Sequence, residues 1–291
     1  MSLRLQMLQV ARLAPRVLGD ATELVSSFIL GQQNPDGGFR DKSGQSDLYY
    51  TVFGVDAALA LQVDLDKALL RSYLTSFSDG EKLDFVHLCS LIRCRSMAGF
   101  EDGQADRLAN CLAAYRAADG GFNPKADSKV STVYANFLAY AAYQDLGQAM
   151  PEMLSLVQSF KHLETDDSWA NERHVTIGST TATAAAVSVL LDQGMPINQG
   201  VSDWLKKRVH PMGGFLAAPQ APVPDLLSTA TALHALAGME VPFEPFKELC
   251  LDFIDSLWTN EGSFYGHWQE ETLDSEYTYY ALLALGHLSV G

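Results

Sequence analysis

The sequence has little positive charge. Its 20 lysines and arginines face 35 aspartates and glutamates, which gives a formal net charge of −15 over 291 residues. No block of lysine or arginine interrupts this excess of acid. Because a negative field repels phosphate backbones and anionic lipid headgroups, we expect no nucleic-acid partner.

Long apolar runs are also lacking. The longest uncharged run, residues 175–191, carries several threonines and serines among its alanines, which favours a helix packed inside a protein over one that faces lipid. Residues 1–19 interleave arginines with leucines and therefore predict an amphipathic helix instead of a secretory signal. We expect no integral membrane segment.

Cysteine is scarce. The four cysteines lie in apolar, helix-like stretches and form no close pair of the kind that binds metal: Cys89, Cys94, Cys111 and Cys250. Buried free thiols are typical of a reducing compartment, so the sequence predicts a cytoplasmic protein.

What the sequence does contain is internal repetition. Turns of glycine followed by phenylalanine recur at residues 37–39, 120–122, 213–215 and 262–264, and weaker versions lie between them. They define a unit of about 40 to 50 residues that is repeated six times. Each unit has an amphipathic helix before the turn and a charge-poor helix after it, and a charge-poor helix requires burial on all sides. The charge-poor stretches are 47–61, 84–93, 131–143, 179–191, 225–236 and 275–285.

Six helix pairs can form an open solenoid or a closed ring. An open solenoid needs polar terminal repeats, whereas the sixth charge-poor helix here is as apolar as the others and is followed at once by the chain end. We therefore expect an all-α fold, an α/α toroid of six outer and six inner helices around a central cavity. The toroid is predicted to be a single domain, 1–291, in which the helix at 1–19 precedes six repeats at 20–291.

The repeat also resembles a known family. Gly37-Gly38-Phe39, followed by Tyr50-Thr51 and Ala58-Leu59, resembles the prenyltransferase and squalene oxidase repeat. That repeat is shared by the β subunits of protein prenyltransferases and by terpene and squalene cyclases, and the resemblance extends over nearly the whole chain. It implies an isoprenoid or terpenoid ligand in the cavity, and either a helical-repeat partner protein or a homodimer.

The resemblance also implies where a zinc ion would bind. In the prenyltransferases an Asp-x-Cys at the fifth inner helix and a His at the sixth hold zinc. Here Asp225 is present, but Leu227 replaces the Cys and Tyr277 replaces the His, and neither is a suitable ligand. We therefore expect no zinc cofactor.

The diphosphate site of the prenyltransferases is altered as well. The loop at 215–224, where the family carries cations that neutralise the leaving diphosphate, has no basic residue. Conventional prenyl transfer to cysteine is therefore disfavoured.

Candidate catalytic groups lie at the starts of the last two inner helices. The proton-donating motif of the cyclases aligns with residues 225–228 but has Leu227 at its central acid. In a toroid the inner helices start at one end of the ring, where crowded carboxyls raise one another's pKa. We expect Asp225, Glu276 and Tyr277 to act as acids or polar anchors. Aspartate is also a common helix N-cap, which is a purely structural interpretation of Asp225.

Aromatic and small residues on the inner helices predict an apolar slot for the ligand. Alternatively, the same side chains simply fill the hole as core residues. The expected cavity residues are Tyr50, Phe53, Phe85, Tyr134, Thr231 and Tyr280.

Three other functions stay open at this point. The first is a metal-free enzyme similar to the terpene cyclases, and the second is a non-catalytic interaction partner. The third is a toroid glycosidase, which would need two carboxyls roughly 5 to 9.5 Å apart.

Overall fold

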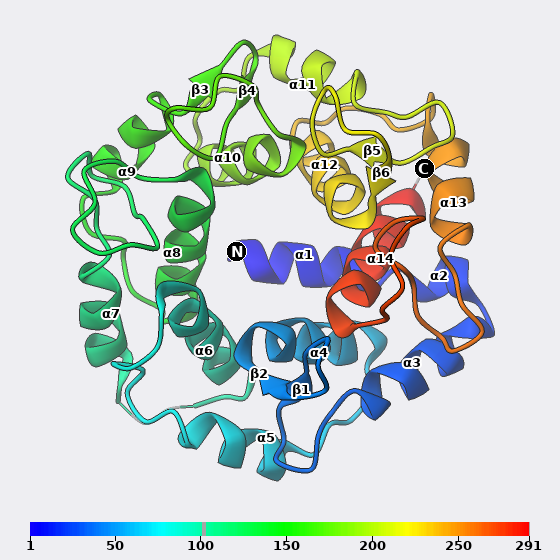
Figure 1. Cartoon of the computed structure of the whole chain (residues 1–291), viewed down its shortest axis with the longest axis horizontal. Helices are drawn as coiled ribbons and strands as arrows, with labels where there is room; N and C mark the ends of the chain where they lie inside the picture. The colour runs from blue at the N-terminus through cyan, green and yellow to red at the C-terminus, as the bar shows by residue number, and fades with distance from the viewer. Residues whose placement is uncertain (101–102, 291) are drawn as a thin grey trace.

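Helices dominate the computed structural model, which describes residues 1–100 and 103–290. The inner helices are α4 (Leu48–Leu61), α6 (Phe85–Met97), α8 (Val133–Asp145), α10 (Thr180–Asp192), α12 (Leu226–Gly238) and α14 (Ser275–Leu288). Each inner helix packs on the next, and α14 packs on α4, which closes the ring (Figure 1). The outer helices are α3 (Ala21–Gly31), α5 (Lys67–Thr75), α7 (Ala105–Ala113), α9 (Met153–Phe160), α11 (Gln199–Lys206) and α13 (Lys247–Asp255). The predicted α/α toroid is confirmed.

A side-chain cap precedes every inner helix. Each capping oxygen accepts a hydrogen bond from a backbone N–H of the first turn, which would otherwise lack a partner. The six caps are Asp47, Asp84, Thr132, Ser179, Asp225 and Asp274. Because the inner helices run in the same direction, these caps surround one end of the ring, which we call the mouth.

Glycine-phenylalanine turns connect α4, α8 and α12 to the outer layer. Phe39, Phe122 and Phe215 are fully buried, and the backbone N–H of each donates to a side chain one turn inside the inner helix. For Phe39 the acceptor is Thr51 Oγ1, at 3.0 Å. Gly37 has φ of +98°, and a Cβ there would lie 2.2 Å from the Leu69 carbonyl oxygen, so glycine is required.

Short antiparallel hairpins form part of the rim around the mouth. β1 (Phe39–Arg40) pairs with β2 (Ser46–Asp47), β3 (Glu164–Thr165) with β4 (Ser168–Trp169), and β5 (Phe215–Leu216) with β6 (Pro224–Asp225). In the first and third pairs the second strand ends at the capping aspartate. The hairpin therefore delivers the cap to the start of the inner helix.

The N-terminal segment crosses the other end of the ring. Residues 1–19 form two helices, α1 (Leu3–Ala11) and α2 (Pro15–Leu18), where one had been expected. The break precedes Pro15, which lacks an N–H and begins the second helix. In Figure 1, α1 crosses the central opening. Its Leu3 N–H donates to Gln144 Oε1 at 3.0 Å, and Arg4 pairs with Asp145 at 3.0 Å, so α1 forms a floor at the C-terminal ends of the inner helices.

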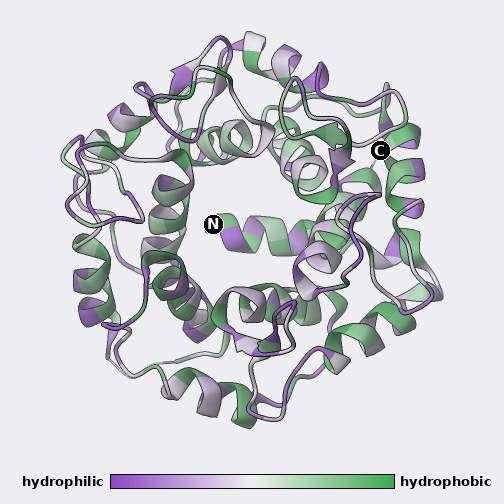
Figure 2. Cartoon of the chain, viewed as in Figure 1, coloured by the Kyte–Doolittle hydropathy of each residue, from purple (hydrophilic) through white to green (hydrophobic). Residues whose placement is uncertain are grey.

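Hydropathy follows the two layers. The outer helices mix hydrophilic and hydrophobic residues, whereas the inner helices carry few charged residues (Figure 2). In the described residues, no helix is both long and apolar enough to cross a bilayer. The cysteines are free thiols, of which Cys89, Cys94 and Cys250 are buried and Cys111 is partly buried.

Candidate functional site

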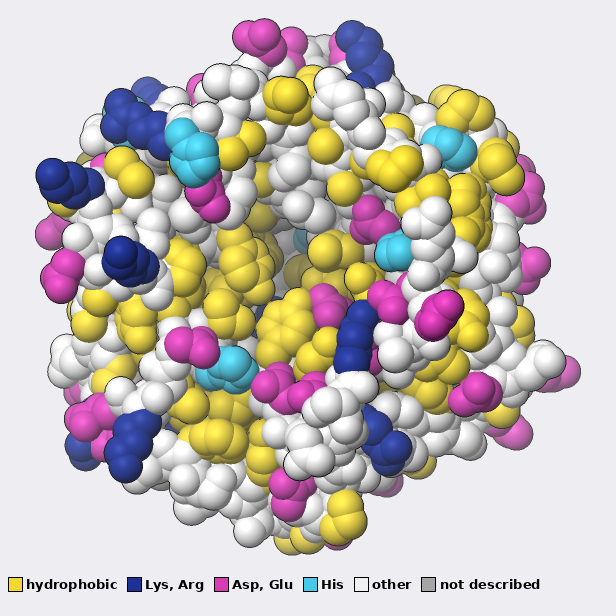
Figure 3. Space-filling model, viewed as in Figure 1, with side chains coloured by type: hydrophobic (Ala, Val, Ile, Leu, Met, Phe, Trp, Pro, Cys, Tyr) yellow, Lys and Arg dark blue, Asp and Glu magenta, His cyan; other side chains and the backbone are white. Residues whose placement is uncertain are grey.

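A central cavity of about 530 Å³ extends from the mouth to Met7 on the floor helix. Figure 3 shows the hollow at the centre of this face, with a largely hydrophobic wall. The inward positions follow a simple count from each N-cap. The second residue after the cap lines the cavity in α4, α8, α10 and α12: Tyr49, Tyr134, Thr181 and Leu227. The sixth residue does so in α10, α12 and α14: Ala185, Thr231 and Tyr280. The ninth does so in α10 and α12: Ser188 and His234.

Aromatic side chains form one side of the wall. Tyr49, Tyr134 and Tyr280 line the central cavity and also a smaller adjoining one of about 80 Å³, where Phe53 joins them. The Phe53 ring centroid lies 5.0 Å from that of Tyr49 and 5.4 Å from that of Tyr280. The α10 side carries small alanines instead, so the cavity is an off-centre slot with an aromatic wall.

Glu276 is the acid that contacts this wall. Its side chain is buried, and Oε1 accepts a hydrogen bond from the Tyr49 hydroxyl at 2.6 Å. Burial disfavours the carboxylate and raises the pKa of Glu276 to about 7, although the Tyr49 hydrogen bond and the Lys42 charge oppose the shift. Unlike an ordinary glutamate, Glu276 can therefore carry a proton at neutral pH.

A cation lies beside this acid but is already paired. Lys42 Nζ lies 3.0 Å from Glu270 Oε2 and 3.8 Å from Asp274 Oδ2, and 5.2 Å from the ring centroid of Tyr277. Burial opposes the shift of Glu270, but hydrogen bonds from Thr272 and Lys42 outweigh it and lower its pKa to about 2. The pKa of Glu276 thus lies above the ordinary value for glutamate, and the pKa of Glu270 lies below it.

Asp225 is engaged as a helix cap. Its Oδ1 accepts the backbone N–H of Ser228 at 2.7 Å, and its Oδ2 accepts the Ser228 hydroxyl at 2.8 Å. Burial raises the pKa of Asp225. Tyr277 lies at the rim, where its backbone N–H donates to Asp274, so the three expected catalytic residues occupy distinct environments.

Two of the expected cavity residues lie elsewhere. Phe85 is buried and packs against Tyr115, 5.2 Å between ring centroids, in the layer between inner and outer helices. Tyr50 lies at the rim beside Tyr49 and is not among the residues that line the cavity. Phe85 is the first residue after its cap and Tyr50 the third, and each residue turns a helix by about 100°, which points them away from the axis. Phe53, Tyr134, Thr231 and Tyr280 do line the two cavities.

Counting from the caps would have found Tyr49, the second residue after Asp47. It would also have placed His234 on the wall, on the same face of α12 as Leu227 and Thr231. The sequence analysis missed both.

The match to a family model decides what kind of toroid this is. The model of the prenyltransferase α/α-toroid domain matches residues 6–72 and 183–289. The chain belongs to this family. No curated protein matches this chain.

Solved structures share the fold at low identity. Protein geranylgeranyltransferase-I of Candida albicans, complexed with GGPP, has a TM-score of 0.68 at 16% identity over 82% of this chain and 83% of its own. A variant of the type II terpene cyclase MstE from Scytonema, in complex with geranylgeranyl dihydroxybenzoate, has a TM-score of 0.63 at 15% identity over 95% and 97%. A protein from Actinoplanes has a TM-score of 0.57 at 16% identity over 92% and 97%.

The residues that the resemblance aligns with the zinc ligands of the prenyltransferases do not suit zinc. Both oxygens of Asp225 accept hydrogen bonds from Ser228, Leu227 presents an alkyl chain to the cavity, and Tyr277 presents a phenol. Across residues 1–100 and 103–290, no three His, Cys, Asp or Glu side chains lie close enough to hold a metal ion. We therefore assign no step of the chemistry to zinc.

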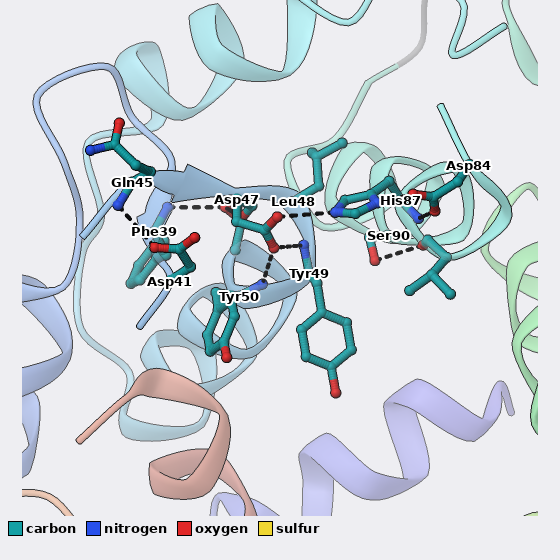
Figure 4. A network of polar contacts seen from close by, with 12 residues as sticks. Phe39, Asp41, Gln45, Asp47, Leu48, Tyr49, Tyr50, Asp84, His87 and Ser90 are labelled. Carbon is teal, nitrogen blue, oxygen red and sulfur yellow. Dashed lines mark hydrogen bonds and ion pairs between the residues drawn. The ribbon is translucent and has the colours of Figure 1, made fainter. Parts of the chain in front are cut away.

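A histidine joins two caps at the rim of this toroid (Figure 4). His87 Nε2 lies 3.0 Å from Asp47 Oδ2, and Nδ1 lies 2.7 Å from Asp84 Oδ2. Burial opposes protonation, but the hydrogen bonds to the two aspartates prevail and raise the pKa of His87. His87 thus links the starts of α4 and α6, and Oδ1 of the same Asp47 accepts the backbone N–H of Tyr49 at 2.8 Å.

Proposed function

We propose that the protein binds an isoprenoid chain in its central cavity and cyclises it without zinc, with Glu276 as the proton donor. The observation that carries the proposal is a buried carboxyl with a pKa of about 7 that is hydrogen-bonded to Tyr49, a residue of the aromatic wall of the cavity. An acid that is protonated at neutral pH is what protonation of an alkene requires. The geranylgeranyltransferase and the terpene cyclase variant named above are each in complex with a geranylgeranyl compound, which supports the choice of ligand.

The reaction needs no other reactant. The O–H bond of Glu276 breaks as the π electrons of a carbon–carbon double bond take the proton, which leaves a carbocation and a carboxylate. A second double bond of the same chain attacks the cation and closes a ring. Loss of a proton from the adjacent carbon to water then forms a new double bond, and solvent returns a proton to Glu276. The product is an isomer of the substrate.

The wall is suited to the cationic stage. The faces of Tyr49, Tyr134 and Tyr280 present negative quadrupoles to a cation in the cavity, and burial keeps these phenols protonated. Tyr49 is a positioning residue, because it donates to Oε1 and leaves the second oxygen of Glu276 to carry the proton.

The rim favours a single acid over the paired carboxylates of a glycosidase. Asp47, Asp84, Asp225 and Asp274 each accept a backbone N–H of their own helix. Glu276 is the rim acid that contacts the cavity wall instead. We retain the cytoplasmic location, and a helical-repeat partner or homodimer, as predictions.

Solvent deuterium tests the proposed step directly. We would incubate the protein in D₂O with geranylgeranyl dihydroxybenzoate or geranylgeraniol and analyse the products by chromatography and mass spectrometry. The expected product is a cyclic isomer that carries one deuterium. Glu276→Gln should abolish its formation, whereas Glu270→Gln, a matched change at the neighbouring ion-paired glutamate, should retain it.

Other outcomes separate the alternatives. Binding of the probes without deuterium incorporation would reject Glu276 as a catalyst and favour a carrier. Deuterium incorporation by Glu276→Gln at the wild-type rate would assign the acid to another residue. Absence of both binding and incorporation would reject the isoprenoid cavity itself and favour a non-catalytic interaction partner.

A further inference from the structure

A pair of histidines lies at the floor of the cavity. His234 lines the cavity on α12, three residues after Thr231 on the same helix face. Its Nδ1 lies 3.1 Å from Nε2 of His287, which is buried on α14 with its ring centroid 6.0 Å from that of Phe243. Two imidazoles on neighbouring inner helices thus form a dyad at the end of the cavity opposite the mouth.

Both rings are neutral. Burial lowers the pKa of His234 to about 4, and burial together with His234 lowers the pKa of His287 to about 3. A neutral imidazole has no charge with which to hold a phosphate or a carboxylate. It can exchange a hydrogen bond with a neutral polar group.

The other ring nitrogen of His234, Nε2, is available to a ligand. Among the described residues, Nε2 of His234 has no hydrogen-bond partner, and the side chain borders the central cavity. Ser188 borders the same part of the cavity, and its hydroxyl donates to the Ala184 carbonyl at 2.8 Å, so the oxygen can still accept. His234 and Ser188 also border an open pocket beside α1, so Nε2 faces open space, where a ligand with a matching hydroxyl can take the place of water.

The tautomer of the pair decides which ligand group fits. If His234 Nδ1 carries the proton and donates to His287, Nε2 is an acceptor. If His287 donates instead, Nε2 of His234 carries the proton and is a donor. A carbonyl or an ether satisfies only the second arrangement, whereas a hydroxyl satisfies both because it donates and accepts.

We propose that His234 and Ser188 form a hydroxyl-binding subsite at the cavity floor, which takes the alcohol end of an isoprenoid alcohol. The subsite depends on the proposed binding of an isoprenoid but not on the acid chemistry of Glu276. It also orients the chain. Seven residues separate the second and ninth positions after a cap, or about 10 Å along the helix, so an alcohol at the floor directs the opposite, alkene end towards the mouth and Glu276.

Two probes with the same carbon skeleton test the subsite. Farnesol has a hydroxyl, and α-farnesene has none. Delivered from the same cyclodextrin and measured by calorimetry, farnesol should bind about tenfold more tightly to the wild-type protein. His234→Leu should remove this preference, whereas His234→Gln, which keeps an amide near the Nε2 position, should retain much of it. His162→Leu, the same change at an exposed histidine, should leave it intact.

A second measurement avoids any dependence on the folding of variants. In ¹⁵N spectra of the wild-type imidazoles, farnesol should shift Nε2 of His234 and α-farnesene should not. The absence of that shift would overturn the subsite even if His234→Leu does not fold.

The remaining outcomes distinguish the subsite from the proposed function. Equal affinities for the two probes would overturn the subsite and leave the isoprenoid cavity standing. A farnesol preference that survives His234→Leu but disappears in Tyr49→Phe would place the hydroxyl at the mouth and also overturn the subsite. Failure of both probes to bind would overturn both proposals.

Discussion

Glu276 should make the stability of the protein fall as the pH rises. Its pKa is raised from 4.5 to about 7 in the folded protein. Between these values the folded state binds more protons than the unfolded state, so the free energy of unfolding decreases as the pH increases through this window. A difference of 2.5 pKa units at 1.36 kcal/mol each corresponds to about 3 kcal/mol by pH 8.

Glu276→Gln removes this effect while its amide oxygen can still accept the Tyr49 hydrogen bond. The variant and the wild type should have similar stability near pH 5, and the variant should gain up to about 3 kcal/mol over the wild type by pH 8. In a thermal scan the gain at pH 8 corresponds to about 6 °C. Urea unfolding at pH 5, 6, 7 and 8, followed by tryptophan fluorescence, measures the difference directly.

Glu270→Gln provides the opposite control. The pKa of Glu270 is lowered to about 2, so its stabilising contribution is present above pH 4.5 and is lost as the pH falls towards 2. That variant should be less stable than the wild type by a nearly constant amount from pH 5 to 8. If the profiles of Glu276→Gln and the wild type are parallel over this range, Glu276 does not have a raised pKa and the proposed proton donor is wrong.

Two further changes test the rim and the floor. Because the pKa of His87 is raised, its ion pairs stabilise the fold fully below pH 6.5 and lose their effect as the pH rises through the folded pKa. His87→Asn should therefore lower the free energy of unfolding in urea by about 1 kcal/mol at pH 6 and by much less at pH 9. Gly286→Ala places a Cβ 2.0 Å from the Val10 carbonyl oxygen, so it should displace α1, lower stability by about 2 kcal/mol and speed tryptic cleavage after Arg12. Gly31→Ala, with no atom within 4 Å of its Cβ, should cause neither effect, and equal cleavage of both variants would refute the close contact of α1.

The ring could be predicted from the sequence because its determinants are local and repeated. The buried phenylalanine of each turn, the cap and the threonine one turn later recur at nearly constant spacing, as Phe39, Asp47 and Thr51 show. Charge-poor inner helices and amphipathic outer helices then specify which layer is buried.

The inward face of each helix was harder to predict. Ser131 and Thr132 are both good caps, and the sequence analysis began the third helix one residue early. A shift of one residue rotates a helix by about 100°, which is enough to exchange Tyr49 for Tyr50 on the wall. The expected cavity residues therefore included some that line the cavity and others, such as Phe85, that pack in the core.

The decisive contacts of the site cross the ring and have no local signature. Tyr49 and Glu276 are 227 residues apart, and His234 and His287 are 53 apart. The pKa of Glu276 depends on burial between α14 and α4, which follows from ring closure. The sequence showed an acid at the right helix start, but only the assembled ring shows that the acid is buried.

The packing of α1 on α14 bears on how the protein is made. α1 is synthesised before α14, yet it packs on α14, and α4 also lacks one of its packing partners until α14 is made. Until then the growing chain is an arc of helix pairs whose first members lack their packing partners and expose apolar faces. Contacts of such long sequence separation slow folding and leave intermediates prone to aggregation. Completion of the ring is therefore a late step that joins helices far apart in the sequence, and the cavity exists only after it.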